Sequence, residues 1–569
     1  MKSDGSSIPV STSLTGFYRK AVAKRKASVD KRVFYLSVQV IFNAIVIGIV
    51  AKGLVFLIDG ITNLAFYGRF SLAYASPAGN HLGLAVIIVP IVGAVLVGFM
   101  ARYGSKAIGG HGIPEAMEKI ILDESRIPPA LTFLKPLSAA LSIGTGGPFG
   151  AEGPIIATGG AFGSLTGQWM HISPGERKIV LAAGACAGMA AIFGSPLASV
   201  LLAVELLLFE FSPRSVIPVG LACVTGAGMH FLMFGTQPVF LMPQIPVPTT
   251  GNLAIYVLMG ALVGVIASLV SRSVYWIEDM FERLPVHWMW FPAIGAVAIG
   301  VVGYFSPKTM GVGYDNIKWL LQGGAPLAVM ATLGLLKYIS WSISLGSGTS
   351  GGTLAPLFTI GGALGAVLGG LVLRFFPLTH ISIATSALVG MAAMFSGASR
   401  AWLTSVVFAI ETTGQLNGLL PLLGACLAAY FVSFFLMKGT IMTEKIHRRG
   451  VRTPDAFEPD TLQTVSVREL MTPAEGEVVS SPAVFASDDA GLAAELMGEY
   501  DRAQIAVKED REDGAEEDDT KDKVIGVITA QAILHFYSHQ RQKNQGYQSP
   551  TRTRRILAQG RKILRTHKN

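Results

Sequence analysis

Charged residues are scarce in this chain. Only 14% of its 569 residues are Asp, Glu, Lys or Arg, against about a quarter in soluble domains, while 51% are hydrophobic and the mean hydropathy is +0.51. This shortage excludes a soluble globular enzyme. The 65 glycines do not indicate disorder, because they lie among Leu, Val and Ile rather than in polar tracts. The composition predicts a protein that lies mostly in lipid.

Cysteine is rare as well. Cys186, Cys223 and Cys426 all lie in apolar stretches, and none stands at a Cys/His spacing typical of a metal site. We therefore expect neither a metal nor a disulfide framework. His230, His287 and His380 are single residues without the convergent partners that a membrane-embedded enzyme would need, so such an enzyme is the weaker alternative.

The net charge of +8 is concentrated near the two ends of the chain. Seven Lys or Arg lie between Arg19 and Arg32, and nine lie between Arg541 and Asn569 without an acid. Residues 33–58 form an apolar run too long for the core of a signal peptide. Because positive charge beside membrane spans marks the cytoplasmic side, we expect a multi-pass protein of the cell membrane with both termini cytoplasmic. We expect the lipid bilayer, and not nucleic acid, as a partner of the protein. The basic tail either lies near anionic lipid or stays disordered, and we favour the second alternative.

Several of the apolar segments are short, and they repeat. Residues 130–143 and 196–209 are shorter than the roughly 20 residues that an upright span needs. The motif at 150–154 (GAEGP) returns at 352–356 (GTLAP) with an offset of 202, as do further landmarks on both sides. We infer two homologous halves of inverted topology, at about 33–235 and about 253–442, with a site where they meet.

Three segments carry the chemistry of that site, at 110–115 (GHGIPE), 150–154 and 352–356. In each, glycine precedes a proline that fits the first turn of a helix. A helix start exposes free backbone N–H groups and the positive end of the helix dipole. Helix starts that converge within the membrane therefore predict a site for a small anion, and glycine lets the ion approach the amides.

The order and spacing of these segments resemble the signature regions of the CLC family of chloride channels and proton-coupled anion exchangers, over about residues 31–449. The resemblance implies an all-α polytopic membrane domain at 33–442 with the CLC fold, two inverted repeats and many short, tilted and broken helices. It also implies a homodimer with one anion pathway in each subunit, chloride as ligand and no required cofactor. The anion would be bound by His111, Gly112, Ile113, Ala151, Gly153, Thr353, Leu354 and Ile441.

Glu152 is the expected gate. Together with Lys135 it is the only Asp, Glu, Lys or Arg of residues 130–175, and an ionisable group in a membrane normally marks a pathway. The resemblance implies that Glu152 blocks the anion path when charged and swings away when protonated; the alternative is a carboxylate that caps its own helix. Lys135 either supplies positive potential to the pore or pairs with Glu205 or Glu411, which we expect to be structural.

Two positions depart from the family pattern at the anion site. His111 stands where similar proteins have serine or proline. Either its imidazole donates to the anion, or it turns to a backbone carbonyl and the amides of Gly112 and Ile113 carry the site. The stretch 438–443 lacks the tyrosine expected at the inner gate, and Ile441 or Met442 takes its place. Weak side-chain ligands would bind the anion loosely, which suits fast conduction.

A third departure concerns protons. In the exchangers an inner proton glutamate directly follows the residue that matches Glu205, and this chain has Leu206 there. Glu210 is a weak substitute, because it lies off the face of Glu205 on a helix. The expectation leans toward a chloride channel or uncoupled conductance, and the alternative is a proton-coupled anion antiporter.

Beyond the membrane domain, residues 443–464 read as a linker and 465–538 as a small α/β module with an acidic loop at 509–522. The segments 467–472 (VRELMT) and 524–529 (VIGVIT) make it resemble a single CBS unit, which implies that it could bind an adenine nucleotide and pair with its twin in a dimer. A nutrient sensor that works through this module is a further alternative. The flanking regions are a basic cytoplasmic N-terminus at 1–32 and a basic tail at 539–569.

Overall fold

The computed structural model describes residues 31–324, 326–379, 381–448, 450, 462, 465–473, 482–510 and 524–544. Almost all of the expected basic N-terminus, and most of the linker, the acidic loop and the basic tail, lie outside these residues. The contacts divide the chain into a membrane unit, Val29–Phe457, and a second unit that contains Glu458–Asn569. Each is described by itself.

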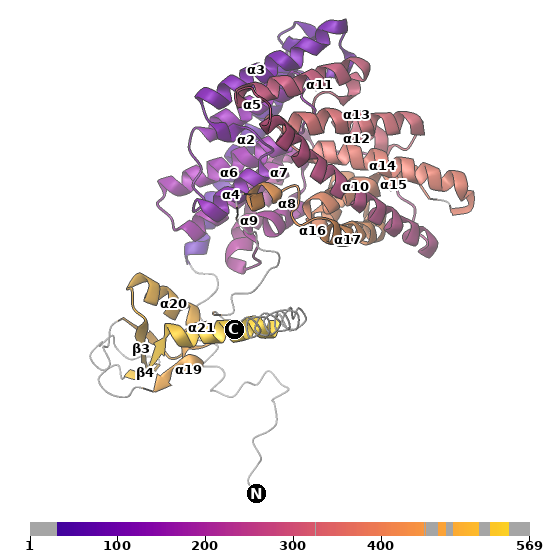
Figure 1. Ribbon diagram of the computed structural model, residues 1–569. Helices are drawn as coiled ribbons and strands as arrows, with labels where there is room; N and C mark the ends of the chain where they lie inside the picture. The colour runs from indigo at the N-terminus through magenta and orange to yellow at the C-terminus, as the bar shows by residue number, and fades with distance from the viewer. Residues whose placement is uncertain are drawn as a thin grey trace, which may run out of the picture. The chain divides into compact units, whose positions relative to one another are not determined.

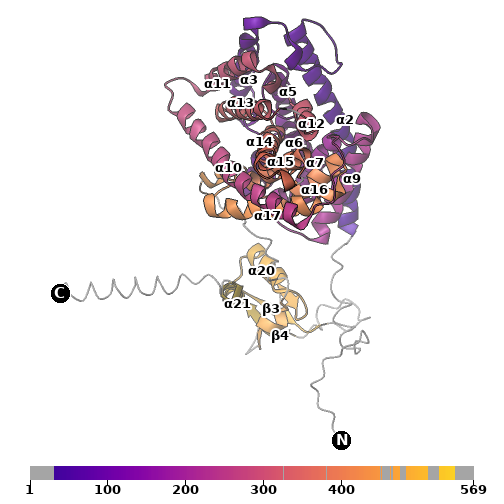
Figure 2. The same ribbon diagram turned by 90° about the vertical axis from the view of Figure 1, so that its right-hand side faces the viewer.

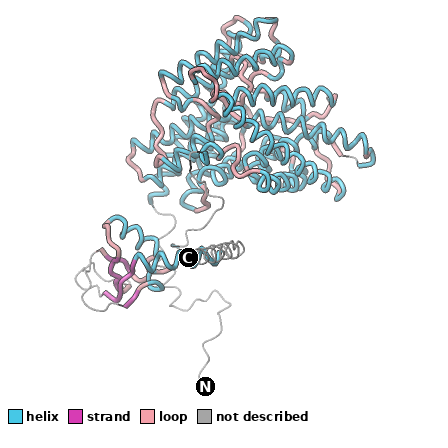
Figure 3. The backbone as a smooth tube through the Cα atoms, viewed as in Figure 1, coloured by secondary structure: helices cyan, strands magenta, loops and turns pink. Residues whose placement is uncertain are grey.

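The described part of the membrane unit is helical (Figures 1 and 3). Its first half contains α2 (Lys31–Tyr67), α3 (Ile88–Tyr103), α4 (Ile113–Leu122), α5 (Leu131–Gly144), α6 (Glu152–Trp169), α7 (Pro174–Phe193), α8 (Pro196–Leu202), the π-helical turn η4 (Ala203–Leu208) and α9 (Pro213–Phe234). Its second half contains α10 (Thr250–Glu282), α11 (Phe291–Phe305), α12 (Tyr314–Leu321), α13 (Leu327–Gly346), α14 (Leu354–Phe375), α15 (Ile383–Ser399), α16 (Trp402–Thr413) and α17 (Leu419–Leu436), followed by the short α18 (Glu444–Arg448).

Eight of the described helical segments are long and apolar enough to cross a membrane, and three shorter apolar segments accompany them. The short ones include Ala130–Gly144 and Pro196–Leu208, close to the segments that the sequence marked as too short. In both views α13, α14 and α15 are stacked in that order (Figures 1 and 2). In the apolar stretch of α14, 67% of the residues are buried inside the protein, a larger share than in any other candidate span, because α14 lies within this stack.

Glycines let the inner helices approach closely. A Cβ on Gly159 of α6 would collide with the carbonyl oxygen of Gly184 on α7, and the reverse substitution would collide as well. The corresponding pair α14 and α15 meets through Gly361 and Gly390 in the same way. Small residues at helix contacts are the usual means of packing in membranes, where apolar burial between helices gains little. The two halves therefore pack by one pattern.

Buried lysines repeat between the halves too. Nζ of Lys135 on α5 donates to the carbonyl oxygens of Ile108, at 2.7 Å, and Gly110, at 2.9 Å. Nζ of Lys337 on α13 makes the same two bonds to the loop before α12, at 2.9 and 3.2 Å. Each lysine thus fixes the loop that leads into a short helix. The alternative in which Lys135 pairs with Glu205 or Glu411 is wrong, because both carboxylates are bound elsewhere.

Those two carboxylates join the halves reciprocally. Glu205, on η4, accepts from the amides of Leu403 (3.1 Å) and Thr404 (2.9 Å) at the start of α16. Glu411, on α16, accepts from the amides of Leu197 (3.0 Å) and Ala198 (2.9 Å) at the start of α8. Each half therefore caps a helix start of the other half, where the orphan amides and the helix dipole favour a negative charge.

The second unit holds a four-stranded sheet of order β1-β4-β3-β2. Its strands are β1 (Thr472–Pro473), β2 (Ala483–Phe485), β3 (Gln504–Lys508) and β4 (Val524–Thr529), and its helices are α19 (Val467–Leu470), α20 (Ala490–Glu499) and α21 (Ala530–Asn544). Strands β2 and β3 are parallel and α20 connects them, whereas β4 pairs antiparallel with β1 and β3. The segment 524–529, which carries part of the resemblance to a CBS unit, forms β4, and α21 follows it directly.

Candidate functional site

The three glycine-rich loops that precede α4, α6 and α14 are joined by backbone hydrogen bonds. Gly150 and Gly352 exchange two of them, at 3.3 and 3.1 Å between nitrogen and oxygen, and the amide of Gly351 donates to the carbonyl oxygen of Gly110 at 3.3 Å. These backbone hydrogen bonds hold the three loops side by side. The starts of three helices from both halves are therefore held at one place.

The backbones at these helix starts touch directly. Gly112 has φ +95°, a conformation that L side chains rarely adopt, and a Cβ there would collide with the carbonyl oxygen of Gly153. A Cβ on Gly153 would collide with the carbonyl oxygen of His111 and lie 2.7 Å from Cα of Gly352. Only glycine allows this approach. Residues 111–113, 151–153 and 353–354, which the sequence proposed as one site, all lie here and are all buried.

Glu152, the first residue of α6, is fully buried at this junction. Its Oε1 accepts a hydrogen bond of 3.0 Å from the hydroxyl of Tyr314. In the described part of the chain Oε2 has no hydrogen-bond partner. A Cβ on Gly150 would collide with the carboxylate, and one on Gly352 would lie 3.1 Å from Oε2, so the carboxylate fills the space beside these two glycines. Lys337 attracts the carboxylate electrostatically. A buried, half-satisfied carboxylate therefore lies on the converging helix starts.

The start of α4 differs from the simple expectation of free amides. The N–H of Gly112 donates to Oε2 of Glu115 at 2.6 Å, so a carboxylate three residues along already occupies this amide. His111 is 7% exposed, and its Nδ1 has no hydrogen-bond partner among the described residues. In this conformation Nδ1 is therefore not bonded to a carbonyl oxygen of the described residues.

Ile441, which was expected to bind the anion, makes two hydrogen bonds through its backbone. Its N–H donates to the carbonyl oxygen of Ala398 on α15 at 3.0 Å, and its carbonyl oxygen accepts from the hydroxyl of Tyr275 on α10 at 2.7 Å. Met442 donates its N–H to Oγ1 of Thr440 at 3.2 Å. These backbone bonds join residue 441 to α10 and α15, and its role as an anion ligand stays a prediction.

Two cavities of about 290 Å³ each lie beside the short helices α4 and α12. One is lined by the start of α4, by Glu115 and Glu118, and by four lysines: Lys106, Lys119, Lys135 and Lys445. The other is lined by the start of α12, including Gly313, Asp315 and Asn316, and by Asp59 and Tyr74. In the cavity beside α4 the four lysines outnumber the two carboxylates, whereas the cavity beside α12 is lined by two carboxylates, Asp59 and Asp315, and by Lys308.

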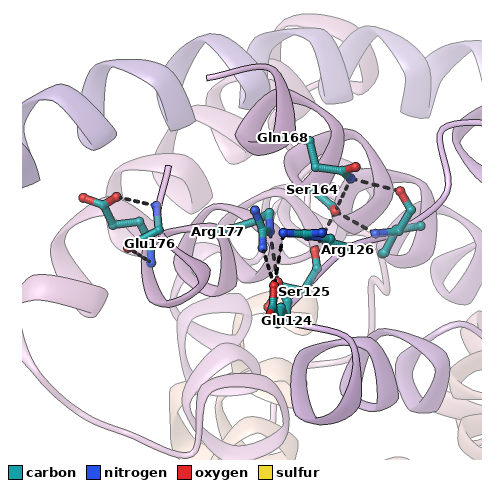
Figure 4. Close-up of polar contacts among 9 residues, drawn as sticks. Glu124, Ser125, Arg126, Ser164, Gln168, Glu176 and Arg177 are labelled. Carbon is teal, nitrogen blue, oxygen red and sulfur yellow. Dashed lines mark hydrogen bonds and ion pairs between the residues drawn. The ribbon is translucent and has the colours of Figure 1, made fainter. Parts of the chain in front are cut away.

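The loop after α4 is pinned by α6 and α7 (Figure 4). Oγ of Ser164 on α6 donates to the carbonyl oxygen of Ser125 at 2.6 Å and accepts from the amide of Ile127 at 2.9 Å. Nε of Arg177 on α7 donates to the carbonyl oxygen of Glu124 at 2.9 Å. Glu124 and Ser125 both have positive φ values, which these contacts hold in place. The short helix that presents Gly112 is therefore anchored at its far end.

Sequence reasoning missed three residues that the structure places here. Tyr314 bonds to the expected gate, Glu115 occupies an amide of the expected anion site, and Lys337 rather than Lys135 acts on Glu152. A signal existed for one of them. That residue is Tyr314. The offset of 202 residues that relates Lys135 to Lys337 also brings the start of α4 close to the start of α12, where Tyr314 lies. It does not predict which of the two helix starts contacts Glu152.

A multi-pass membrane protein with two inverted halves, whose helix starts meet around one buried carboxylate, is the class that the fold and the site define. The model of the family described as "Voltage gated chloride channel" matches residues 92–434, more than half of the chain, and the chain belongs to this family, the CLC family.

Relatives carry names of both channels and exchangers. The chain is 28% identical over 410 residues to "Chloride channel protein CLC-f" of Arabidopsis thaliana, covering 67% of this chain and about half (51%) of that protein. It is 26% identical over 438 residues to "H(+)/Cl(-) exchange transporter ClcA" of Cronobacter sakazakii, covering 74% and 91%. Among solved structures, a slow cyanobacterial Cl⁻/H⁺ antiporter matches with TM-score 0.64, 23% identity and coverage of 72% and 97%. A eukaryotic CLC transporter matches with TM-score 0.61, 19% identity and coverage of 88% and 98%.

Proposed function

We propose that this protein carries chloride, or a similar small anion, across the membrane past the joined helix starts, and that Glu152 is the gate. The observation that carries the proposal is the position of the Glu152 carboxylate, which fills the space beside Gly150 and Gly352. A negative group held there occupies the place that the amides and helix dipoles favour for an anion. Protonation removes its charge, so an anion then competes with it successfully.

We propose further that conduction is uncoupled from protons. The position of the inner proton glutamate is Leu206, an apolar side chain that is 4% exposed. The neighbouring Glu205 has both oxygens bonded to the start of α16, so it is committed to a structural role. Glu210 pairs with Lys178 at 3.6 Å and its side chain is 43% exposed, so it lies at the surface. The second candidate is a proton-coupled antiporter, which the names of the ClcA relatives and the cyanobacterial antiporter favour.

Reversal potentials distinguish the two. Purified protein in liposomes is placed under a chloride gradient, with and without a proton gradient. An uncoupled conductance reverses at the chloride potential at every pH difference. A shift of the reversal potential with the proton gradient would show exchange and would overturn the uncoupled reading while leaving anion transport intact. An absence of any anion flux would overturn the whole proposal.

The gate is tested by Glu152→Gln, which keeps the size of the side chain and removes its titration. We expect anion flux to persist and to lose its dependence on pH. Glu210→Gln is the matched control, because it removes a surface carboxylate of the same half and should leave the pH profile unchanged. A pH profile of Glu152→Gln that matches the wild type would contradict the assignment of the gate.

The remaining expectations are proposals of the same kind. We propose a homodimer in the cell membrane with both termini cytoplasmic, no enzymatic activity and no required cofactor. The second unit would then be a regulatory CBS-like module, and adenine nucleotide its candidate ligand. Deleting the chain after Arg449 tests this: a regulatory module predicts that flux persists with altered control, whereas loss of all transport in a correctly folded variant would contradict it.

A further inference from the structure

Glu152 has one side-chain hydrogen bond in the described structure, and its donor comes from the other half of the protein. The hydroxyl of Tyr314 donates to Oε1 at 3.0 Å. Tyr314 is the first residue of α12, as Ile113 is the first residue of α4 in the first half. Both follow a glycine with positive φ, Gly112 and Gly313. Isoleucine has no hydroxyl, so the bond to the gate is a feature of the second half alone.

The ring of Tyr314 is held by aromatic neighbours. Its centroid lies 5.8 Å from that of Phe193 and 5.9 Å from that of Phe240, and Phe193 packs edge-on against Phe408 at 4.9 Å. Phe193, Phe240 and Phe408 are at most 2% exposed. Because these aromatic neighbours pack against the ring of Tyr314, the ring has little freedom to turn. Its hydroxyl therefore keeps one position, whether or not Glu152 is bonded to it.

The backbone that carries Tyr314 is fixed as well. The bonds from Lys337 to the carbonyl oxygens of Thr309 and Gly311 hold the loop that leads into α12. On the far side, Asp315 accepts a hydrogen bond from the hydroxyl of Tyr74, and both residues line the second cavity. Tyr314 therefore lies between Glu152 and the second cavity, on a backbone segment that these hydrogen bonds hold in place.

We propose that Tyr314 is a positioning residue that holds the Glu152 carboxylate in its blocking place and so sets the pH at which the anion path opens. This inference rests on the proposed function. A hydroxyl that donates to a carboxylate stabilises its charged form, and hydrogen bonds to charged groups are stronger than neutral ones. The bond must break for the carboxylate to leave, so it favours the closed state.

The charged and titratable groups around the gate are few. Tyr314 approaches from α12 and Lys337 from α13, where its ammonium group attracts the carboxylate. His111 precedes α4, and its carbonyl oxygen abuts Gly153, next to the gate. Of these three residues, only Tyr314 can lose its polar group, as in Tyr314→Phe, without a change in charge or in a backbone contact.

The experiment measures anion flux into proteoliposomes as a function of pH for Tyr314→Phe, which keeps the ring and removes the hydroxyl. We expect the half-maximal flux to shift by about one unit toward higher pH, a tenfold change in the protonation constant, because the closed state alone loses a hydrogen bond. Tyr338→Phe is the matched control: it removes a hydroxyl that bonds to Oγ of Ser273 at 2.8 Å on α10, and should leave the midpoint unchanged.

Glu152→Gln and the double variant Tyr314→Phe/Glu152→Gln separate the possible failures. If Glu152→Gln abolishes the pH dependence and Tyr314→Phe leaves the midpoint where it was, the role of Tyr314 is overturned and the gate stands. If Glu152→Gln itself retains the wild-type pH profile, the proposal that Glu152 is the gate is overturned, and the role of Tyr314 falls with it. The double variant should behave as Glu152→Gln does; an additional shift there would show that the tyrosine acts through another group and would also overturn the inference.

Discussion

The reciprocal caps between the halves give a prediction whose size follows from the structure. In Glu411→Ala the amides of Leu197 and Ala198 lose their acceptors, at 3.0 and 2.9 Å. Removal of an N-terminal cap costs about 0.5–2 kcal/mol, and a hydrogen bond to a charged group contributes about 1.5–3 kcal/mol when buried. Because Glu411 is only partly buried, we expect a loss of about 2–4 kcal/mol in the free energy of unfolding.

Glu205→Ala should cost somewhat more, because this carboxylate also accepts from the hydroxyl of Thr404 at 2.7 Å. The assay is the unfolding midpoint in detergent, followed by tryptophan fluorescence. Glu210→Ala serves as the control, since its exposed ion pair with Lys178 should contribute no more than about 1 kcal/mol. If the unfolding midpoints of Glu205→Ala and Glu411→Ala equal that of Glu210→Ala, the reciprocal caps do not hold the halves together and the reasoning is refuted.

Three further perturbations test the same structure. Gly153→Ala should abolish anion flux, because its Cβ would collide with the backbone at His111, whereas Gly175→Ala, which has open space around it, should conduct as the wild type in the same liposome flux assay. Lys337→Met should lower the unfolding midpoint in detergent, since two buried carbonyl oxygens lose their donor at about 1–3 kcal/mol each; a midpoint equal to that of the wild type would contradict this. Ser164→Ala should make residues 123–129 more sensitive to limited proteolysis while leaving anion selectivity unchanged, and unaltered cleavage would argue against the anchoring role.

Local patterns in the sequence were enough to predict the helix starts. A glycine before a proline indicates where a helix begins, and an offset of 202 residues shows that the two halves are equivalent. These signals depend on backbone preferences and on repetition, which are visible along the chain. These signals predicted three helix starts, and the resemblance to the CLC family implied that the residues at 111–113, 151–153 and 353–354 form one site. The structure places these residues together.

The partners of buried polar groups could not be predicted in the same way. The offset shows that Lys135 and Lys337 are equivalent, but only the tertiary structure decides that each bonds to carbonyl oxygens in its own half. It also decides that Glu115 takes the amide of Gly112 and that the gate meets Tyr314 from the other half.

The sequence by itself determined that this protein is two repeated membrane halves with helix starts directed at one place, because composition and periodicity express how segments interact with lipid and with their own backbone. Which half supplies the hydroxyl, the ammonium group and the cap at each point was decided by the packing alone. The two halves pack against one another, so the partners of Glu152, Glu205 and Glu411 lie in the other half, far away along the chain.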